Sequence, residues 1–152
     1  MIRILFVCHG NICRSPMAEF VLKDIVHEKN MSGQFFIRSA ATSREELGSD
    51  IHSGTKRILR QMGIAYEKRK AVQLKHSDYA KYDWIIGMDH YNIANIMRIV
   101  GEDRDGKVHL LLDFTGLGCD VADPWYTGDF EQAYSDIKKG CDALFKYLEK
   151  KL

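Results

Sequence analysis

The chain has 152 residues, 45% of them hydrophobic, a size and composition that suit one soluble domain with its own core. Its 22 Lys and Arg residues nearly balance 21 Asp and Glu residues, so charge favours neither a nucleic acid nor an anionic membrane as partner. The apolar start, residues 1–7, is too short for a signal peptide core or a membrane span, and we expect the four cysteines to be thiols. These features predict one cytoplasmic domain over residues 1–152, a monomer or a weak dimer.

Short β-rich runs alternate along the chain with helical patterns. Strands are expected at 2–7, 35–40, 82–88 and 108–114, and helices at 16–30, 51–63, 90–100 and 130–152. Such alternation implies right-handed crossovers and a parallel sheet with helices on both faces. The sequence therefore predicts an α/β fold whose ligand site lies beyond the carboxyl ends of the strands.

The segment VCHGNICRSP, residues 7–16, connects the first expected strand to the first expected helix. Ser15 followed by Pro16 predicts a helix N-cap and first helical position. The preceding loop would direct its amides inward, and Gly10 and Asn11 are suited to the left-handed backbone angles that this requires. Together with the positive end of the helix dipole, these amides predict a concave phosphate site.

Cys8 and Arg14 stand at the two ends of this loop, in the spacing Cys-x5-Arg. The Arg14 guanidinium could hold two phosphate oxygens at once, and the positive field favours the thiolate form of Cys8. The pattern predicts a thiolate nucleophile facing a phosphate cradle, and it lacks the GxxxxGK of a nucleotide loop. The alternative is a buried structural thiol at Cys8 and a surface charge at Arg14.

Attack by a thiolate on a phosphoester also needs an acid that protonates the departing oxygen. Asp123 is the candidate, because it lies in VADPWYTGD after the fourth expected strand, where Pro124 restricts the backbone. The alternative for an Asp-Pro pair is a plain turn.

VCHGNICRSP with a distant DPWY resembles the low-molecular-weight protein tyrosine phosphatase family. SAATS at 39–43, AVQ at 71–73, YDWIIGMD at 82–89 and the last helix resemble later family segments in the same order, so the likeness covers nearly the whole chain. The resemblance implies sheet order 2-1-3-4, phosphotyrosine protein or peptide substrates, and no metal or organic cofactor. It implies that Cys8 is the nucleophile of a cysteinyl-phosphate route, that Arg14 binds phosphate and stabilises the transition state, and that Asp123 is first acid, then base.

The resemblance also implies roles around these three residues. The phosphate-binding loop would contain His9, Gly10, Asn11, Ile12, Cys13 and Ser15, with Ser39 supporting it from the second strand. Glu45, Trp125 and Tyr126 would form the substrate rim.

Three positions depart from the family pattern. Arg69 stands where many members have a histidine that bonds the loop asparagine, so the support of Asn11 is expected to differ. Glu45 stands where the rim is usually aromatic, which adds a negative charge. His9 replaces a common leucine and could affect the pocket, or could simply face solvent.

Three alternative functions remain open for this sequence. Arsenate reductases of the same fold need a further pair of close cysteines, whereas Cys119 and Cys141 are 22 positions apart. Protein arginine phosphatases tend to have threonine at the position of Ile12, and the isoleucine favours an aryl phosphate. A non-catalytic phosphotyrosine-binding module would have lost the nucleophile or the acid.

Cys13 lies on the same tight loop as Cys8, at a separation that a disulfide could span. An exposed thiolate is readily oxidised to a sulfenic acid, and a neighbouring thiol that condenses with it prevents irreversible oxidation. Cys13 is therefore expected to be a resolving thiol that makes the activity redox-sensitive. The alternative is that Cys13 is a small packing residue.

Overall fold

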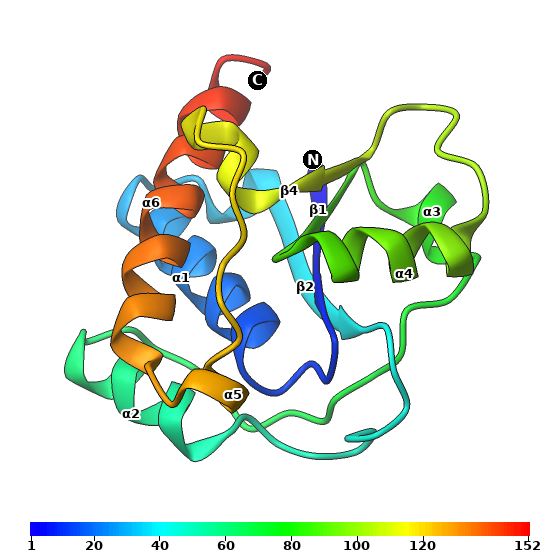
Figure 1. Ribbon diagram of the computed structural model, residues 1–152. Helices are drawn as coiled ribbons and strands as arrows, with labels where there is room; N and C mark the ends of the chain where they lie inside the picture. Colours follow the sequence, from blue (N-terminus) through cyan, green and yellow to red (C-terminus); the bar gives the residue numbers. More distant parts are fainter.

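Four parallel strands form one sheet in the order β2-β1-β3-β4 in the computed structural model, which describes residues 1–152 (Figure 1). The strands are β1 (Ile2–Cys8), β2 (Phe35–Ala41), β3 (Trp84–Gly87) and β4 (Val108–Leu110). Each neighbouring pair is parallel, with Cys8 opposite Ala41 at one end of the sheet. The predicted α/β class and strand order are confirmed.

Helices cover both faces of this sheet. They are α1 (Arg14–Glu28), α2 (Ser53–Gln61), α3 (Asp78–Lys81), α4 (His90–Val100), α5 (Pro124–Thr127) and α6 (Phe130–Glu149), with 3-10 turns η1 (Ser32–Gln34) and η2 (Leu111–Thr115). Figure 1 shows α1, α2 and α6 on one side and α3 and α4 on the other. None of the helices is long and apolar enough to cross a lipid bilayer.

The central strand β1 is buried on both faces, which explains its continuous apolar run. Ile4, Phe6 and Cys8 belong to the larger core, which packs against α1 and α6. Leu5 and Val7 belong to the smaller core beneath α4. The period-two alternation of a strand therefore places the Cys8 side chain on the α1 side, above the start of that helix.

The fourth strand is shorter than the sequence predicts. Residues 108–114 were expected to be extended, but β4 ends at Leu110 and η2 follows. Leu111 and Leu112 are both buried in the same core, and consecutive strand residues would point to opposite faces. A 3-10 turn places both side chains inward, so burial overrides the β-rich pattern here.

Candidate active site

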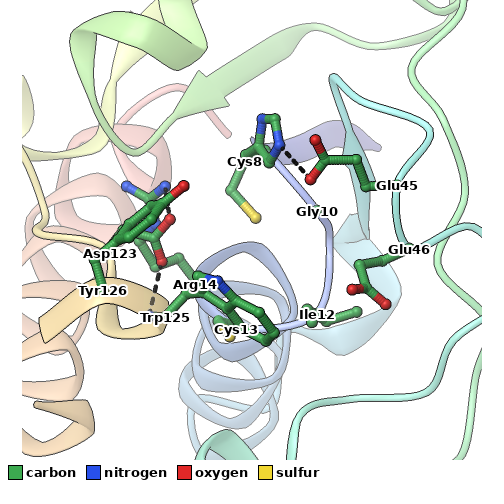
Figure 2. Close-up of a pocket in the computed structure, with 11 residues that line it drawn as sticks. Cys8, Gly10, Ile12, Cys13, Arg14, Glu45, Glu46, Asp123, Trp125 and Tyr126 are labelled. Atoms are coloured by element: carbon green, nitrogen blue, oxygen red, sulfur yellow. Dashed lines mark hydrogen bonds and ion pairs between the residues drawn. The ribbon is translucent and has the colours of Figure 1, made fainter. Parts of the chain in front are cut away.

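The loop between β1 and α1 forms a pocket of about 80 Å³ at the carboxyl end of the sheet (Figure 2). Its lining consists of Cys8, His9, Gly10, Ile12, Cys13, Arg14, Glu45, Glu46, Asp123, Trp125 and Tyr126. The three predicted catalytic residues therefore lie in one cavity, although Asp123 is far from Cys8 in the sequence. Asn11, Ser15 and Ser39 do not line the pocket, and their side chains are hydrogen-bonded to one another in the protein interior.

Two expectations about the loop backbone are corrected. Asn11 has a φ of 58°, as predicted, whereas Gly10 is not in the left-handed region. Helix α1 begins at Arg14, and its N-cap is Cys13 without a side-chain hydrogen bond, so Ser15 is not the N-cap. The Ser15 hydroxyl is instead directed at the loop, because it serves Cys8 and Asn11.

A buried chain of hydrogen bonds holds Cys8 from below. The Cys8 Sγ lies 3.0 Å from the Ser15 Oγ and 3.4 Å from the Ser15 amide. Asn11 Nδ2 donates to the Ser15 Oγ at 2.8 Å and to the Ser39 Oγ at 2.9 Å. Ser39 in turn donates to the carboxylate of Glu19 at 2.6 Å.

Ser15 joins the Cys8 sulfur to this chain. Asn11 Nδ2 can only donate, so the Ser15 oxygen accepts from it. The Cys8 thiol donates to the same Ser15 oxygen, and the Cys8 sulfur accepts from the Ser15 amide. A thiolate at Cys8 would instead accept from the Ser15 hydroxyl as well as from the amide, so both groups can hold the form that acts as a nucleophile.

Arg14 lies beneath the pocket with only 2% of its surface exposed. Its Nη1 donates to Asp89 at 2.6 Å and to the Val121 carbonyl at 2.9 Å, while its Nη2 lies 3.3 Å from the Asp123 carboxylate. The Nε is buried and has no acceptor in the protein, so a phosphate oxygen held by the loop would satisfy it.

The charge of Arg14 is secured by its surroundings. Burial alone would lower the pKa of this guanidinium. The neighbouring charges of Cys8, Asp123 and Asp89 more than offset burial and raise that pKa above its ordinary value. Arg14 is thus a fixed cation at the base of the pocket.

Asp123 reaches the pocket from the opposite wall. It is the N-cap of α5, and its Oδ1 accepts from the Trp125 amide at 3.0 Å. Pro124 occupies the first helical position, so this short helix fixes the direction of the carboxylate. Figure 2 shows Asp123 and Tyr126 on one side of Cys8 and Glu45 and Glu46 on the other.

The rim combines two aromatic residues with carboxylates. Trp125 and Tyr126 are largely exposed, and the ring of His52 meets Trp125 edge to face with centroids 5.8 Å apart. Glu45 accepts a 2.9 Å hydrogen bond from His9 Nε2, which joins the loop to this side of the rim. The His9 side chain is therefore bound to the rim and does not simply face solvent.

Arg69 supports the loop differently from a histidine, as the sequence predicts. Its Nη2 donates to the Asn11 carbonyl and its Nη1 to the Ser49 carbonyl at 3.0 Å. The Asn11 side chain is held separately, because its Oδ1 accepts from the Val72 amide at 3.2 Å. Arg69 thus stabilises the loop backbone, because its planar guanidinium binds the carbonyls of Asn11 and Ser49 at the same time.

The model of the family described as low molecular weight phosphotyrosine protein phosphatase matches residues 3–152. The chain belongs to this family. The low molecular weight protein-tyrosine-phosphatase YfkJ of Bacillus subtilis is 39% identical over 99% of this chain and 97% of that protein. The crystal structure of YfkJ has a TM-score of 0.96 at 38% identity and covers 99% and 96% of the two chains.

Two further solved structures bear on the function of this phosphatase. SP-PTP, a low molecular weight protein tyrosine phosphatase from Streptococcus pyogenes, has a TM-score of 0.88 at 43% identity over 97% and 93% of the chains. DARP, a Drosophila arginine phosphatase, has a TM-score of 0.86 at 26% identity over 95% and 96%. The enzyme class is low-molecular-weight protein-tyrosine phosphatase, and membership of the family implies phosphoprotein substrates.

Three site residues of this phosphatase were missed by sequence reasoning. Glu46 lines the pocket beside Glu45, Asp89 fixes Arg14, and Glu19 ends the buried hydrogen-bond chain. Glu19 follows Ser15 by four positions on α1, so helical spacing could have placed it on the same face. Nothing local pointed to Asp89, which meets Arg14 only through the packing of β1 beside β3.

Proposed function

We propose that this phosphatase hydrolyses phosphotyrosine in proteins or peptides through a cysteinyl-phosphate intermediate. The observation that carries the proposal is the alignment of three groups in one pocket. The Cys8 sulfur is hydrogen-bonded to the Ser15 hydroxyl and amide, Arg14 offers a buried Nε without an acceptor, and Asp123 faces both from the opposite wall. The proposed enzyme uses no metal or organic cofactor.

The first step transfers the phosphoryl group to Cys8. The thiolate attacks phosphorus, the bond between phosphorus and the tyrosyl oxygen breaks, and protonated Asp123 gives its proton to that oxygen. Arg14 and the loop amides stabilise the charge that builds on the phosphoryl oxygens. Asp89 holds Arg14 in place through the 2.6 Å bond.

The second step returns the enzyme to its starting state. Asp123, now a carboxylate, takes a proton from a water that attacks the phosphocysteine. The sulfur–phosphorus bond breaks, inorganic phosphate leaves, and the Cys8 thiolate is again held by Ser15. The same carboxyl group therefore serves as acid and then as base.

The pocket walls favour an aryl phosphate. Ile12 gives the loop an apolar side chain, while Trp125 and Tyr126 form an exposed aromatic wall beside Asp123. A tyrosyl stem reaches the sulfur of a recessed cysteine, whereas a phosphoserine stem is short. Glu45 and Glu46 add negative charge to one side of the mouth and should favour basic residues next to the phosphotyrosine.

The experiment that tests the proposed function compares substrates side by side. Phosphotyrosine peptide, phosphoarginine and arsenate are offered to the same preparation, with thioredoxin as the reductant for arsenate. We expect turnover of the phosphotyrosine peptide to exceed the other two. The similarity to DARP makes phosphoarginine the strongest competitor, and a preference for it would overturn the assignment.

We also propose that the enzyme is redox-sensitive through Cys13. Cys13 lies in the same pocket as Cys8, and burial, followed by the nearby Cys8 charge, raises its pKa to about 12. Oxidation of Cys8 to a sulfenic acid removes the Cys8 charge and with it the second cause of the raised Cys13 pKa. The Cys13 sulfur then attacks the Cys8 sulfur, the sulfenic oxygen leaves as water, and a disulfide forms. Brief peroxide treatment should inactivate the wild type reversibly and the Cys13→Ser variant irreversibly, with dithiothreitol restoring only the former. Full rescue of the variant would refute the role.

The remaining proposals concern domain organisation, cellular location, oligomeric state and partners. Residues 1–152 form one phosphatase domain that works in the cytoplasm as a monomer or weak dimer, without a nucleic acid or membrane partner. Near-balanced charge supports the last point. Analytical ultracentrifugation across concentrations tests the oligomeric state, and a tight dimer would contradict it.

A further inference from the structure

A second cavity of about 440 Å³ adjoins the catalytic pocket on its Asp123 side. The two cavities share His9, Arg14, Asp123 and Tyr126 as walls. The rest of the second cavity, called here the side groove, is lined by Asp89, Tyr91, Asn92, Asn95, Asp120, Val121 and Ala122. The residues next to a phosphotyrosine in the catalytic pocket can therefore lie along this groove or along the Glu45 side, which is across Cys8 from Asp123 (Figure 2).

The side groove carries a net negative charge. Three carboxyl groups line it, those of Asp89, Asp120 and Asp123. While Asp123 is protonated as the general acid, the carboxylates of Asp89 and Asp120 face one guanidinium, that of Arg14. No lysine lines the groove. His9 brings no unpaired positive charge, because its ring is bound to Glu45 at 2.9 Å. A bound phosphate adds further negative charge at the shared wall, so the groove suits a cation.

One of these carboxylates has a free oxygen. Asp120 Oδ1 accepts from the His90 amide at 3.1 Å and lies 2.6 Å from His90 Nδ1, whereas its Oδ2 has no partner in the protein. The Asp120 side chain is 43% exposed, so that oxygen is accessible. Asp89 and Asp123, in contrast, use both oxygens within the protein.

Two aromatic side chains flank the same space without packing into the core. Tyr91, near the start of α4, is 81% exposed, and Tyr126, on α5, is 82% exposed. Exposed tyrosines beside a free carboxylate are the surroundings that a guanidinium or ammonium group binds, by ring-face attraction and by an ion pair.

We propose that the side groove is a substrate subsite for a basic residue beside the phosphotyrosine, arginine in preference to lysine. Asp120 is the ion-pair partner, and Tyr91 and Tyr126 supply the aromatic walls. The subsite rests on the proposed function, since it needs a phosphotyrosine peptide in the adjoining pocket. The side groove is separate from the Glu45 side of the rim. The two acidic surfaces therefore bind substrate residues on opposite sides of the same phosphotyrosine.

A panel of phosphotyrosine peptides tests the subsite. Each peptide has uncharged flanks, and one flanking position at a time carries Arg, Lys, Ala or Glu, with kcat and KM measured from phosphate release. We expect one position at which Arg exceeds Ala by about fivefold in kcat/KM, the size of an exposed ion pair with an aromatic contact. Asp120→Asn should bring that ratio close to one by raising KM for the Arg peptide, with kcat unchanged.

Further variants separate charge recognition from structural damage. Asp120→Lys should make Glu better than Arg at the same position, and Tyr91→Leu should reduce the advantage of Arg more than that of Lys. Glu45→Gln should act on the other side of the phosphotyrosine. Glu102→Gln, which removes an exposed carboxylate outside the groove, is the matched control and should change nothing.

Two results would overturn the subsite while the proposed function stands. One is an Arg to Ala ratio that is equal in the wild type and in Asp120→Asn. The other is an absence of any charge preference on the side that Glu45→Gln does not affect, while phosphotyrosine peptides are turned over. Failure to hydrolyse every phosphotyrosine peptide while 4-nitrophenyl phosphate is hydrolysed would overturn the proposed function and the subsite together.

Discussion

Replacement of Asn11 tests whether the buried hydrogen-bond chain organises the loop. Its side chain donates two hydrogen bonds and accepts one, and its backbone has a φ of 58°. Loss of the three bonds costs about 3 kcal/mol of folding free energy, at ~1 kcal/mol each. Asn11→Ala also loses the short polar side chain that lets asparagine tolerate the left-handed region, where a Cβ costs ~1–2 kcal/mol relative to glycine.

Asn11→Gly is the matched control, because it removes the same three bonds without the backbone strain. Glycine loses about 0.4–1 kcal/mol more chain entropy on folding, so at the middle of the two ranges the glycine variant should be more stable than the alanine variant by about 0.8 kcal/mol. Urea unfolding measures this difference. Both variants should lose kcat on 4-nitrophenyl phosphate by on the order of 10- to 100-fold, since a displaced catalytic group loses its alignment.

Two results would refute this reasoning. An alanine variant more stable than the glycine variant by about 0.4–1 kcal/mol would mean that the left-handed backbone costs nothing at this position. Retention of kcat within twofold in both variants would mean that the Ser15 hydroxyl and Cys8 stay aligned without the amide of Asn11.

Three further predictions follow from the site and its surroundings. Asp123→Ala should lower kcat far more for phosphotyrosine than for 4-nitrophenyl phosphate, because only the tyrosyl oxygen, with a pKa of about 10, needs a proton to leave. Equal losses would indicate a structural role. Arg69→Lys keeps the charge but not the fork between two carbonyls, and should lower kcat more than it raises KM. An unchanged kcat would contradict this. Burial raises the pKa of Asp50, but hydrogen bonds from Lys56 and two backbone amides outweigh it and bring that pKa to about 2. A depressed carboxyl pKa stabilises the fold above the unfolded value of about 4 and ceases to do so as pH falls toward 2, so Asp50→Asn should lose less unfolding free energy than the wild type over that range. Urea titrations with the same pH dependence for both proteins would refute it.

The sequence contained most of the fold because its elements are governed by local patterns. The apolar run of β1 and the helical spacing of α6 each reflect a single buried face, and the alternation of strands and helices fixes a parallel sheet. The short helices α3 and α5 have four residues each, too few to show a helical period. The end of β4 depended on Leu111 and Leu112 packing on one side, which is a tertiary effect.

The residues of the active site likewise divide into those that the sequence predicts and those that only the structure shows. Cys8 and Arg14 could be assigned because one loop of the sequence contains both, and Asp123 because it follows a strand whose end faces that loop. Asp89 could not be assigned from the sequence, because its partner Arg14 lies 75 positions away along the chain. Ser15 was misassigned as an N-cap because the sequence shows a hydroxyl before a proline but not which neighbour that hydroxyl meets.

The most direct test of the central claim is the capture of the phosphorylated enzyme. The wild type is mixed with phosphotyrosine peptide, quenched in acid within milliseconds and digested, and the fragment containing residues 8–14 is sequenced by mass spectrometry. We expect one phosphoryl group on the Cys8 sulfur in the wild type, more of it in Asp123→Ala with 4-nitrophenyl phosphate, and none in Cys8→Ser, which should bind phosphotyrosine peptide without hydrolysing it. A phosphoryl group on any other residue, or hydrolysis by Cys8→Ser above background, would exclude Cys8 as the nucleophile.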